Sequence, residues 1–171
     1  MPKAAFIALP KCRLHDVSPL LETLALQDWR LRTLTLDGAP CTTAEGLAVC
    51  TDGSVEEAVP LDLALCVLPG GLYPAQVWND IRLHRYVRQF AGRKGWFAVS
   101  GEGSACLAGA GLLGGLRFSA PLSFVESQAP LFRYSIHMTT PISIDGGVVS
   151  SDGSDPAGFC QAVFGRLNIG V

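Results

Sequence analysis

The residues best placed to do chemistry gather around Ser100. A short apolar run, Trp96 to Val99, has the length of a buried strand, and small residues followed by a helical apolar pattern come directly after it. A strand that turns sharply into a helix lifts one side chain out of the backbone and points the first amides of the helix toward it. We therefore predict that Ser100 occupies such a turn, where its hydroxyl could attack or bind a small molecule.

A nucleophilic serine needs a base within hydrogen-bond reach, because its hydroxyl is hardly ionised at neutral pH. The sequence has three histidines, His15, His84 and His137. His84 falls on the exposed side of a predicted amphipathic helix, and His137 lies in a late loop or strand where its ring either points toward a pocket or does not. The sequence therefore assigns no serine–histidine pair.

Two carboxylates, Glu102 and Asp16, each have a structural interpretation, and Glu102 also has a functional one. Glu102, two positions after Ser100, either adds a negative charge to the site or stabilises the positive end of the following helix. Asp16 precedes Pro19 at the start of a predicted helix, and that position suits a helix N-cap.

Composition narrows the classes of protein. A length of 171 residues fits one domain, residues 1–171, and the 49% hydrophobic and 16% charged fractions indicate extensive burial or an interface. The net charge is −2 and the basic residues are scattered, so we expect no nucleic-acid partner. The apolar runs are too short to cross a membrane, and the N-terminus lacks the pattern of a signal peptide, so we expect a cytoplasmic protein.

The six cysteines contain no C-x-x-C pair and sit mostly in apolar surroundings. In a cytoplasmic chain this favours reduced, buried thiols, and it argues against a metal site. Cys106 lies six residues beyond Ser100 on the predicted helix, and we interpret it as a core thiol. No cofactor is expected.

Buried apolar strands alternate with amphipathic helices along the chain, which predicts an α/β fold with a mostly parallel sheet and helices on both faces. In one predicted helix, residues 78–90, the inward-facing side chains are expected to be Ile81, Tyr86, Val87 and Phe90. The predicted strands are residues 3–9, 30–36, a short edge strand at 47–50, 61–68 and 96–99; the other helices begin near residues 20 and 101; a hairpin spans 141–150, and a last helix spans 156–167.

The segment A-V-S-G-E-G-S-A-C-L, residues 98–107, resembles the nucleophile elbow of the ThiJ/PfpI family in the class I glutamine amidotransferase-like superfamily, whose usual pattern is A-[IV]-C-x-G-[PA]-[TS]-x-x-L. Ser100 stands where that family has its reactive cysteine, and Glu102 stands where the family prefers glycine. The resemblance covers essentially the whole chain and implies a flavodoxin-like three-layer sandwich.

Other segments extend the resemblance. L-P-G-G at residues 68–71 is similar to a strand-end loop whose glycine amide helps the elbow amide form an oxyanion hole, which implies oxyanion or ligand-binding roles for Gly70, Gly71 and Gly101. D-V-S-P-L-L-E resembles the family's D-x-x-G-P-x-E, whose first acid hydrogen-bonds the cysteine, so Asp16 is implied to lie beside Ser100.

The same resemblance indicates that the family's histidine is also replaced. L-R-F-S-A-P, residues 116–121, is similar to a family segment that commonly reads T-T-H-P, and Ala120 stands at the histidine. If Asp16 and Glu102 meet at the site, their repulsion would raise the pKa of one of them.

Two classes of function follow. A catalytically degenerate relative would serve as a small-molecule-binding, stress-response or regulatory module. The replacement of the family's cysteine and histidine by Ser100 and Ala120 at the matching positions favours this class. The alternative is a hydrolase, hydratase or lyase that acts on a small molecule through Ser100, Asp16 or both. The ligand is an unidentified small molecule in either case. A homodimer is expected, because the charged fraction is low and the family usually dimerises.

Overall fold

A six-stranded sheet forms the middle layer of the molecule in a computed structural model that describes residues 1–167. The strand order is β2-β1-β5-β6-β10-β9, and every neighbouring pair is parallel except β9 with β10. This arrangement confirms the predicted α/β class and its mostly parallel sheet. The strands are β1 (Lys3–Ile7), β2 (Arg30–Leu34), β5 (Leu65–Leu68), β6 (Trp96–Ser100), β9 (Ile142–Asp145) and β10 (Val148–Ser151).

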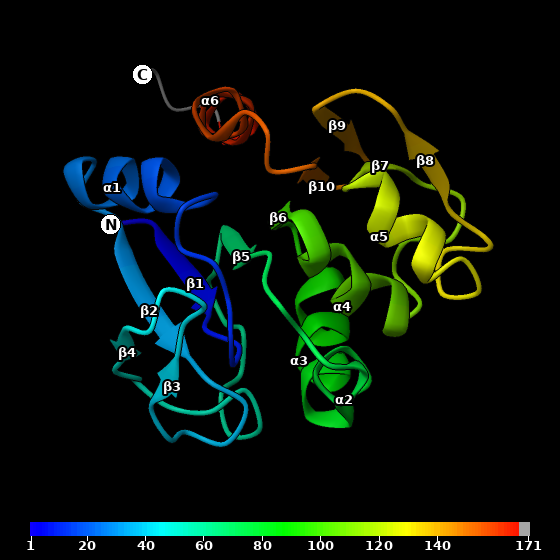
Figure 1. The fold of residues 1–171 in the computed structure, drawn as a ribbon. Helices are drawn as coiled ribbons and strands as arrows, with labels where there is room; N and C mark the ends of the chain where they lie inside the picture. Colours follow the sequence, from blue (N-terminus) through cyan, green and yellow to red (C-terminus); the bar gives the residue numbers. More distant parts are fainter. Residues whose placement is uncertain (168–171) are drawn as a thin grey trace.

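Helices cover both faces of this sheet, which confirms the layered arrangement (Figure 1). On one face, α1 and α6 lie side by side, and on the other α3 packs with α4. The helices are α1 (Ser18–Leu26), α2 (Ala75–Trp78), α3 (Ile81–Ala91), α4 (Ser104–Gly109), α5 (Leu122–Ser127) and α6 (Pro156–Arg166). No helix within residues 1–167 is long and apolar enough to cross a membrane.

Two small sheets flank the central one. The antiparallel pair β3 (Cys41–Thr42) and β4 (Ala48–Val49) contains the short strand predicted near residues 47–50, but it pairs apart from the central sheet. The parallel pair β7 (Arg117–Ser119) and β8 (Ile136–Met138) lies near β9 and β10. The predicted hairpin at 141–150 is confirmed: Asp145 pairs with Val148 across two glycines with positive φ, as a tight hairpin turn requires.

Several boundaries differ from the sequence prediction. β1 and β2 each end two residues earlier than predicted, at Ile7 and Leu34, and β5 begins at Leu65 rather than Leu61. The helix predicted over residues 78–90 begins at Ile81 as α3, because residue 78 ends the separate helix α2.

In α3, Asp80 caps the helix by accepting a hydrogen bond from the Arg82 amide at 2.8 Å. Tyr86, Val87 and Phe90 are buried as predicted, whereas Ile81 is 79% exposed and its predicted inward orientation is wrong. The buried stripe of α3 is Leu83, Tyr86, Val87 and Phe90, and Ile81, two residues before Leu83, lies on the opposite side of the helix.

The parallel topology decides where the site lies. Adjacent strands β1, β5 and β6 run in the same direction, so the loops that follow them emerge at one edge of the sheet. The loops after β1 and β5 carry Asp16 and Gly70, and Ser100 is the last residue of β6 at the same edge.

Candidate functional site

Backbone hydrogen bonds hold together the loops that follow β1 and β5. The Arg13 amide donates to the Gly70 carbonyl at 2.7 Å, and the Leu72 amide donates to the Lys11 carbonyl at 3.1 Å. The Tyr73 hydroxyl donates to the carbonyl of Pro69 at 2.6 Å or of Gly70 at 3.0 Å. These contacts fix the Gly70–Gly71 segment beside the end of β6.

Ser100 and Asp16 meet in the interior. The Ser100 hydroxyl donates to Asp16 Oδ2 at 3.3 Å, and both residues are buried, Ser100 with 0% of its surface exposed. Burial raises the pKa of Asp16, and this effect outweighs the opposing influences of Arg13 and of the hydrogen bond from Ser100. The N-cap of α1 is Val17, so the helix-capping interpretation of Asp16 is wrong.

Glycines allow this close approach around Asp16. A Cβ atom on Gly70 would lie 2.9 Å from Glu102 Oε2 and 3.3 Å from Asp16 Oδ2. A Cβ atom on Gly153, in the loop after β10, would lie 2.9 Å from the same Asp16 oxygen. Side chains larger than hydrogen at these positions would displace the carboxylates, so the packing of the site depends on both glycines.

The sharp turn itself falls one residue later than predicted. Ser100 is the last residue of β6 and has an extended backbone, with φ −112° and ψ 139°. Gly101 has φ +52°, in the left-handed region, and begins a short 3₁₀ turn that leads into α4. A Cβ atom on Gly101 would lie 3.6 Å from the Gly70 Cα and 3.9 Å from Asp16 Oδ2. A side chain at position 101 would therefore project toward the loops that carry Asp16 and Gly70.

Glu102 occupies the backbone donor predicted for an oxyanion hole. Its Oε2 accepts a hydrogen bond from the Gly71 amide at 3.1 Å. Arg13 holds the same carboxylate with both arms of its guanidinium, Nη1 to Oε2 at 3.3 Å and Nη2 to Oε1 at 3.1 Å. Such forked, charge-assisted pairs are directional and strong for their class. The Gly71 donor is thus already engaged by the chain's own carboxylate.

Arg13 is the residue that the sequence analysis missed. It lies three positions before Asp16, and its Nη1 is 3.8 Å from Asp16 Oδ2. The guanidinium therefore sits between two carboxylates that are far apart in sequence, Asp16 and Glu102. A C-R-L-H-D segment gives no sign of this on its own, because only the fold brings Glu102 to Arg13.

The other candidates contact different groups. His84 Nε2 donates to the Trp78 carbonyl at 2.7 Å, so this side chain is part-buried rather than solvated as predicted. His137 Nε2 donates to the Ala120 carbonyl at 2.8 Å. Burial raises the pKa of Cys106 to about 12, in keeping with a core thiol. Within residues 1–167, no group of three His, Cys, Asp or Glu side chains is arranged to hold a metal ion.

The DJ-1/PfpI family model matches residues 2–165 of the chain. The chain therefore belongs to the DJ-1/PfpI family, which confirms the resemblance drawn from the elbow segment. None of the curated proteins with which the chain was compared matches it.

Solved structures share the fold over nearly the whole chain. The DJ-1 superfamily protein Atu0886 from Agrobacterium tumefaciens is 25% identical with a TM-score of 0.84, covering 100% of this chain and 92% of its own. A ThiJ/PfpI domain protein from Brachyspira murdochii is 16% identical with a TM-score of 0.86, covering 97% and 96% respectively.

A two-domain protein from Anabaena variabilis, with DJ-1/ThiJ/PfpI-like and ferritin-like domains, is 19% identical with a TM-score of 0.88. The match covers 99% of this chain and 49% of that protein, so the present chain spans about half its length.

The pH dependence of stability in the Asp16→Asn variant tests the effect of burial on Asp16. A raised pKa means that the folded protein holds a proton that the unfolded chain releases, so this carboxyl's contribution to stability is lost as pH rises from about 4 through the folded value. We expect the free energy of unfolding of Asp16→Asn, relative to wild type, to increase with pH between about 4 and 7. Urea denaturation over a pH series measures this difference. Glu22→Gln, at an exposed position of α1, controls for loss of one charge; a difference for Asp16→Asn that is flat or falls with pH would contradict the assignment.

Two cysteine substitutions test which residue projects from the turn. Positions 100 and 101 are both buried, but the Ser100 side chain is enclosed with its hydroxyl on Asp16, whereas a Cβ atom on Gly101 would point toward the loops that end the sheet, with its nearest neighbours at 3.6 and 3.9 Å. We therefore expect a thiol introduced by Gly101→Cys to react with iodoacetamide faster than one introduced by Ser100→Cys, because the more enclosed thiol forms less thiolate and is reached less often. The left-handed backbone at position 101 costs a non-glycine residue about 1 kcal/mol, which a folded domain tolerates. Labelling followed by peptide mass spectrometry gives the two rates, with circular dichroism to confirm folding. Equal rates would contradict projection from Gly101, and faster labelling at position 100 would place the projecting residue at Ser100.

Proposed function

We propose that this DJ-1/PfpI-family chain is catalytically degenerate and works as a small-molecule-binding, stress-response or regulatory module. The observation that carries the proposal is the Glu102 carboxylate on the Gly71 amide, held there by Arg13. An oxyanion hole stabilises developing negative charge with free, preorganised donors. Here a resident negative charge occupies the donor, so a second anion at the same point would be repelled.

The turn supports the same proposal. The resemblance aligns Ser100 with the family's cysteine, whereas the left-handed backbone favours Gly101 as the position from which a nucleophile would project. Neither Ser100 nor Gly101 carries a thiol. Likewise Ala120, aligned with the family's histidine, offers only a backbone carbonyl, and His137 donates to it.

Access to the interior is also restricted. Ser100 is fully buried, and the partly exposed Arg13 and Glu102 side chains lie between Asp16 and the outside. A substrate would have to displace the Arg13–Glu102 pair to reach the serine hydroxyl. We infer that binding to this end of the sheet, rather than turnover within it, is the retained function. A cytoplasmic homodimer stays our expectation from sequence.

The alternative, a small-molecule hydrolase, hydratase or lyase, draws on one contact. The Ser100 hydroxyl donates to Asp16 at 3.3 Å, and the raised pKa of Asp16 brings that carboxyl closer to the range of a general base. If Glu102 and Arg13 moved aside, Asp16 could take the serine proton.

Turnover assays separate the two functions. We expect the purified protein to turn over neither methylglyoxal, a substrate for thiol-dependent relatives, nor p-nitrophenyl acetate, an activated ester suited to a serine nucleophile, above the buffer rate. Serine supplies no thiolate, and its oxyanion donor is engaged. Turnover that is abolished in both Ser100→Ala and Asp16→Asn, while Glu22→Gln retains it, would establish the enzyme instead.

A further inference from the structure

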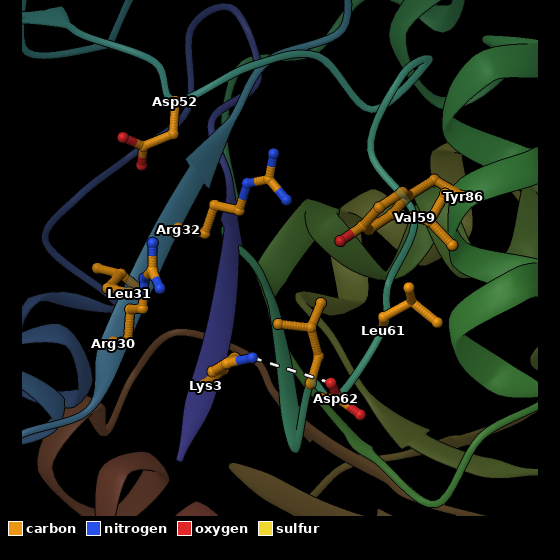
Figure 2. Close-up of a pocket in the computed structure, with 10 residues that line it drawn as sticks. Lys3, Arg30, Leu31, Arg32, Asp52, Val59, Leu61, Asp62 and Tyr86 are labelled. Atoms are coloured by element: carbon orange, nitrogen blue, oxygen red, sulfur yellow. Dashed lines mark ion pairs between the residues drawn. The ribbon is translucent and has the colours of Figure 1, made fainter. Parts of the chain in front are cut away.

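A pocket lies at the end of the sheet opposite to Ser100. It has a volume of about 650 Å³ and is bordered by the beginnings of β1 and β2, by α3 and by the segment of residues 52–63 (Figure 2). Lys3 and Arg30 are the first residues of their strands and pair in register. Because the strands are parallel, this end is remote from the loops that carry Asp16 and Gly70. The pocket is therefore separate from the candidate site described above.

Positive charge gathers in this pocket. Arg30 and Arg32 alternate along β2 and so share one face of the strand, and Lys3 lies beside Arg30. Lys3 is 3.9 Å from Asp62, and Asp52 accepts a hydrogen bond from the Thr33 amide at 2.8 Å. Within residues 1–167 neither arginine forms an ion pair. Three cations against two carboxylates leave a positive excess, with two guanidinium groups available to a ligand.

Tyr86 gives the pocket a buried polar group without a partner. The residue is only 1% exposed, yet its hydroxyl has no hydrogen-bond partner in the described part of the chain. Leaving a buried hydroxyl unpaired costs free energy, and native structures rarely do so without reason. Figure 2 shows this hydroxyl pointing from α3 into the space between the helix and β2. Burial raises the pKa of Tyr86, so the phenol keeps its proton and can donate it to an acceptor.

Apolar side chains complete the wall. Val59 and Leu61, in the segment that crosses between β2 and α3, are 52% and 56% exposed. Exposing large aliphatic side chains to water is unfavourable, so an apolar ligand that covers them would gain binding free energy. The pocket thus combines cations and one hydroxyl donor with an apolar surface.

We propose that this pocket binds a small organic anion, a carboxylate or phosphate carried on an apolar body. The planar guanidinium of Arg32 suits the paired oxygens of either group, and Arg30 adds a second cation. The Tyr86 hydroxyl donates to the anion or to a polar atom next to it, and the apolar body packs on Leu61 and Val59. This site is independent of Glu102 and of the proposed function of the elbow.

Isothermal titration calorimetry with four probes tests the proposal: phenyl phosphate, benzoate, inorganic phosphate and phenol. We expect at least one of the two aromatic anions to bind with one-to-one stoichiometry, at least about tenfold more tightly than either inorganic phosphate or phenol. Inorganic phosphate lacks the apolar body, and phenol lacks the anionic group. Preference between phenyl phosphate and benzoate identifies which anionic group the site takes.

Variants locate the site. Arg32→Gln is expected to weaken binding by about tenfold or more, because it removes the guanidinium that would donate two hydrogen bonds to the anion. Arg117→Gln, an exposed position on β7, makes the same change of charge elsewhere and is expected to leave the affinity within about twofold. Tyr86→Phe is expected to weaken binding about fivefold without lowering the thermal stability of the free protein, because the lost hydroxyl had no partner.

Three outcomes would overturn the proposal. One is the absence of saturable binding of either aromatic anion up to about 10 mM, which is beyond the range of a specific site. The second is an affinity that Arg32→Gln leaves unchanged, and the third is equal weakening by Arg32→Gln and Arg117→Gln, which would reflect net charge alone.

Discussion

The arrangement of the candidate site depends on one interaction, the hydrogen bond from the Gly71 amide to Glu102, with Arg13 clamping the same carboxylate. It joins the loops after β1, β5 and β6 across the edge of the sheet. The positive guanidinium lies between Glu102 and the buried Asp16, so it offsets the repulsion of placing two carboxylates together. Together these contacts stabilise the loops and engage the Gly71 amide, a donor that the proposed function requires to be occupied.

Much of the fold could be predicted from the sequence, because periodicity reports burial. Continuous apolar strands such as β5, with all four residues buried, indicated a parallel sheet covered on both faces. The two glycines after Asp145 predicted the hairpin, since its turn needs positive φ at both positions. Ile81 was misplaced because the buried stripe of α3 starts at Leu83, and a residue two positions earlier lies on the opposite side of a helix.

The candidate site was predictable in part only. The elbow segment and the L-P-G-G loop placed Ser100, Asp16 and Gly71 in one region, and the structure does bring them together. The turn was assigned to Ser100 because the resemblance aligned that residue with the family's cysteine. S-G-E-G also holds two glycines, Gly101 and Gly103, and either could adopt the left-handed region, so the run alone does not show which one turns the chain. The role of Arg13 was beyond sequence reasoning, because its partner Glu102 is 89 positions away. A lone arginine near a strand end has no periodic or motif signal.

Amide hydrogen exchange at Gly71 tests the central claim most directly. In ¹⁵N-labelled protein, a donor held by Glu102 is protected from exchange, and Glu102→Ala removes its acceptor. The account predicts that Gly71 exchanges at least about tenfold faster in Glu102→Ala than in wild type, whereas Glu126→Ala, at an exposed position of α5, leaves it unchanged. Gly71 exchange that is the same in Glu102→Ala and wild type would contradict a Gly71 amide engaged by the chain's own carboxylate.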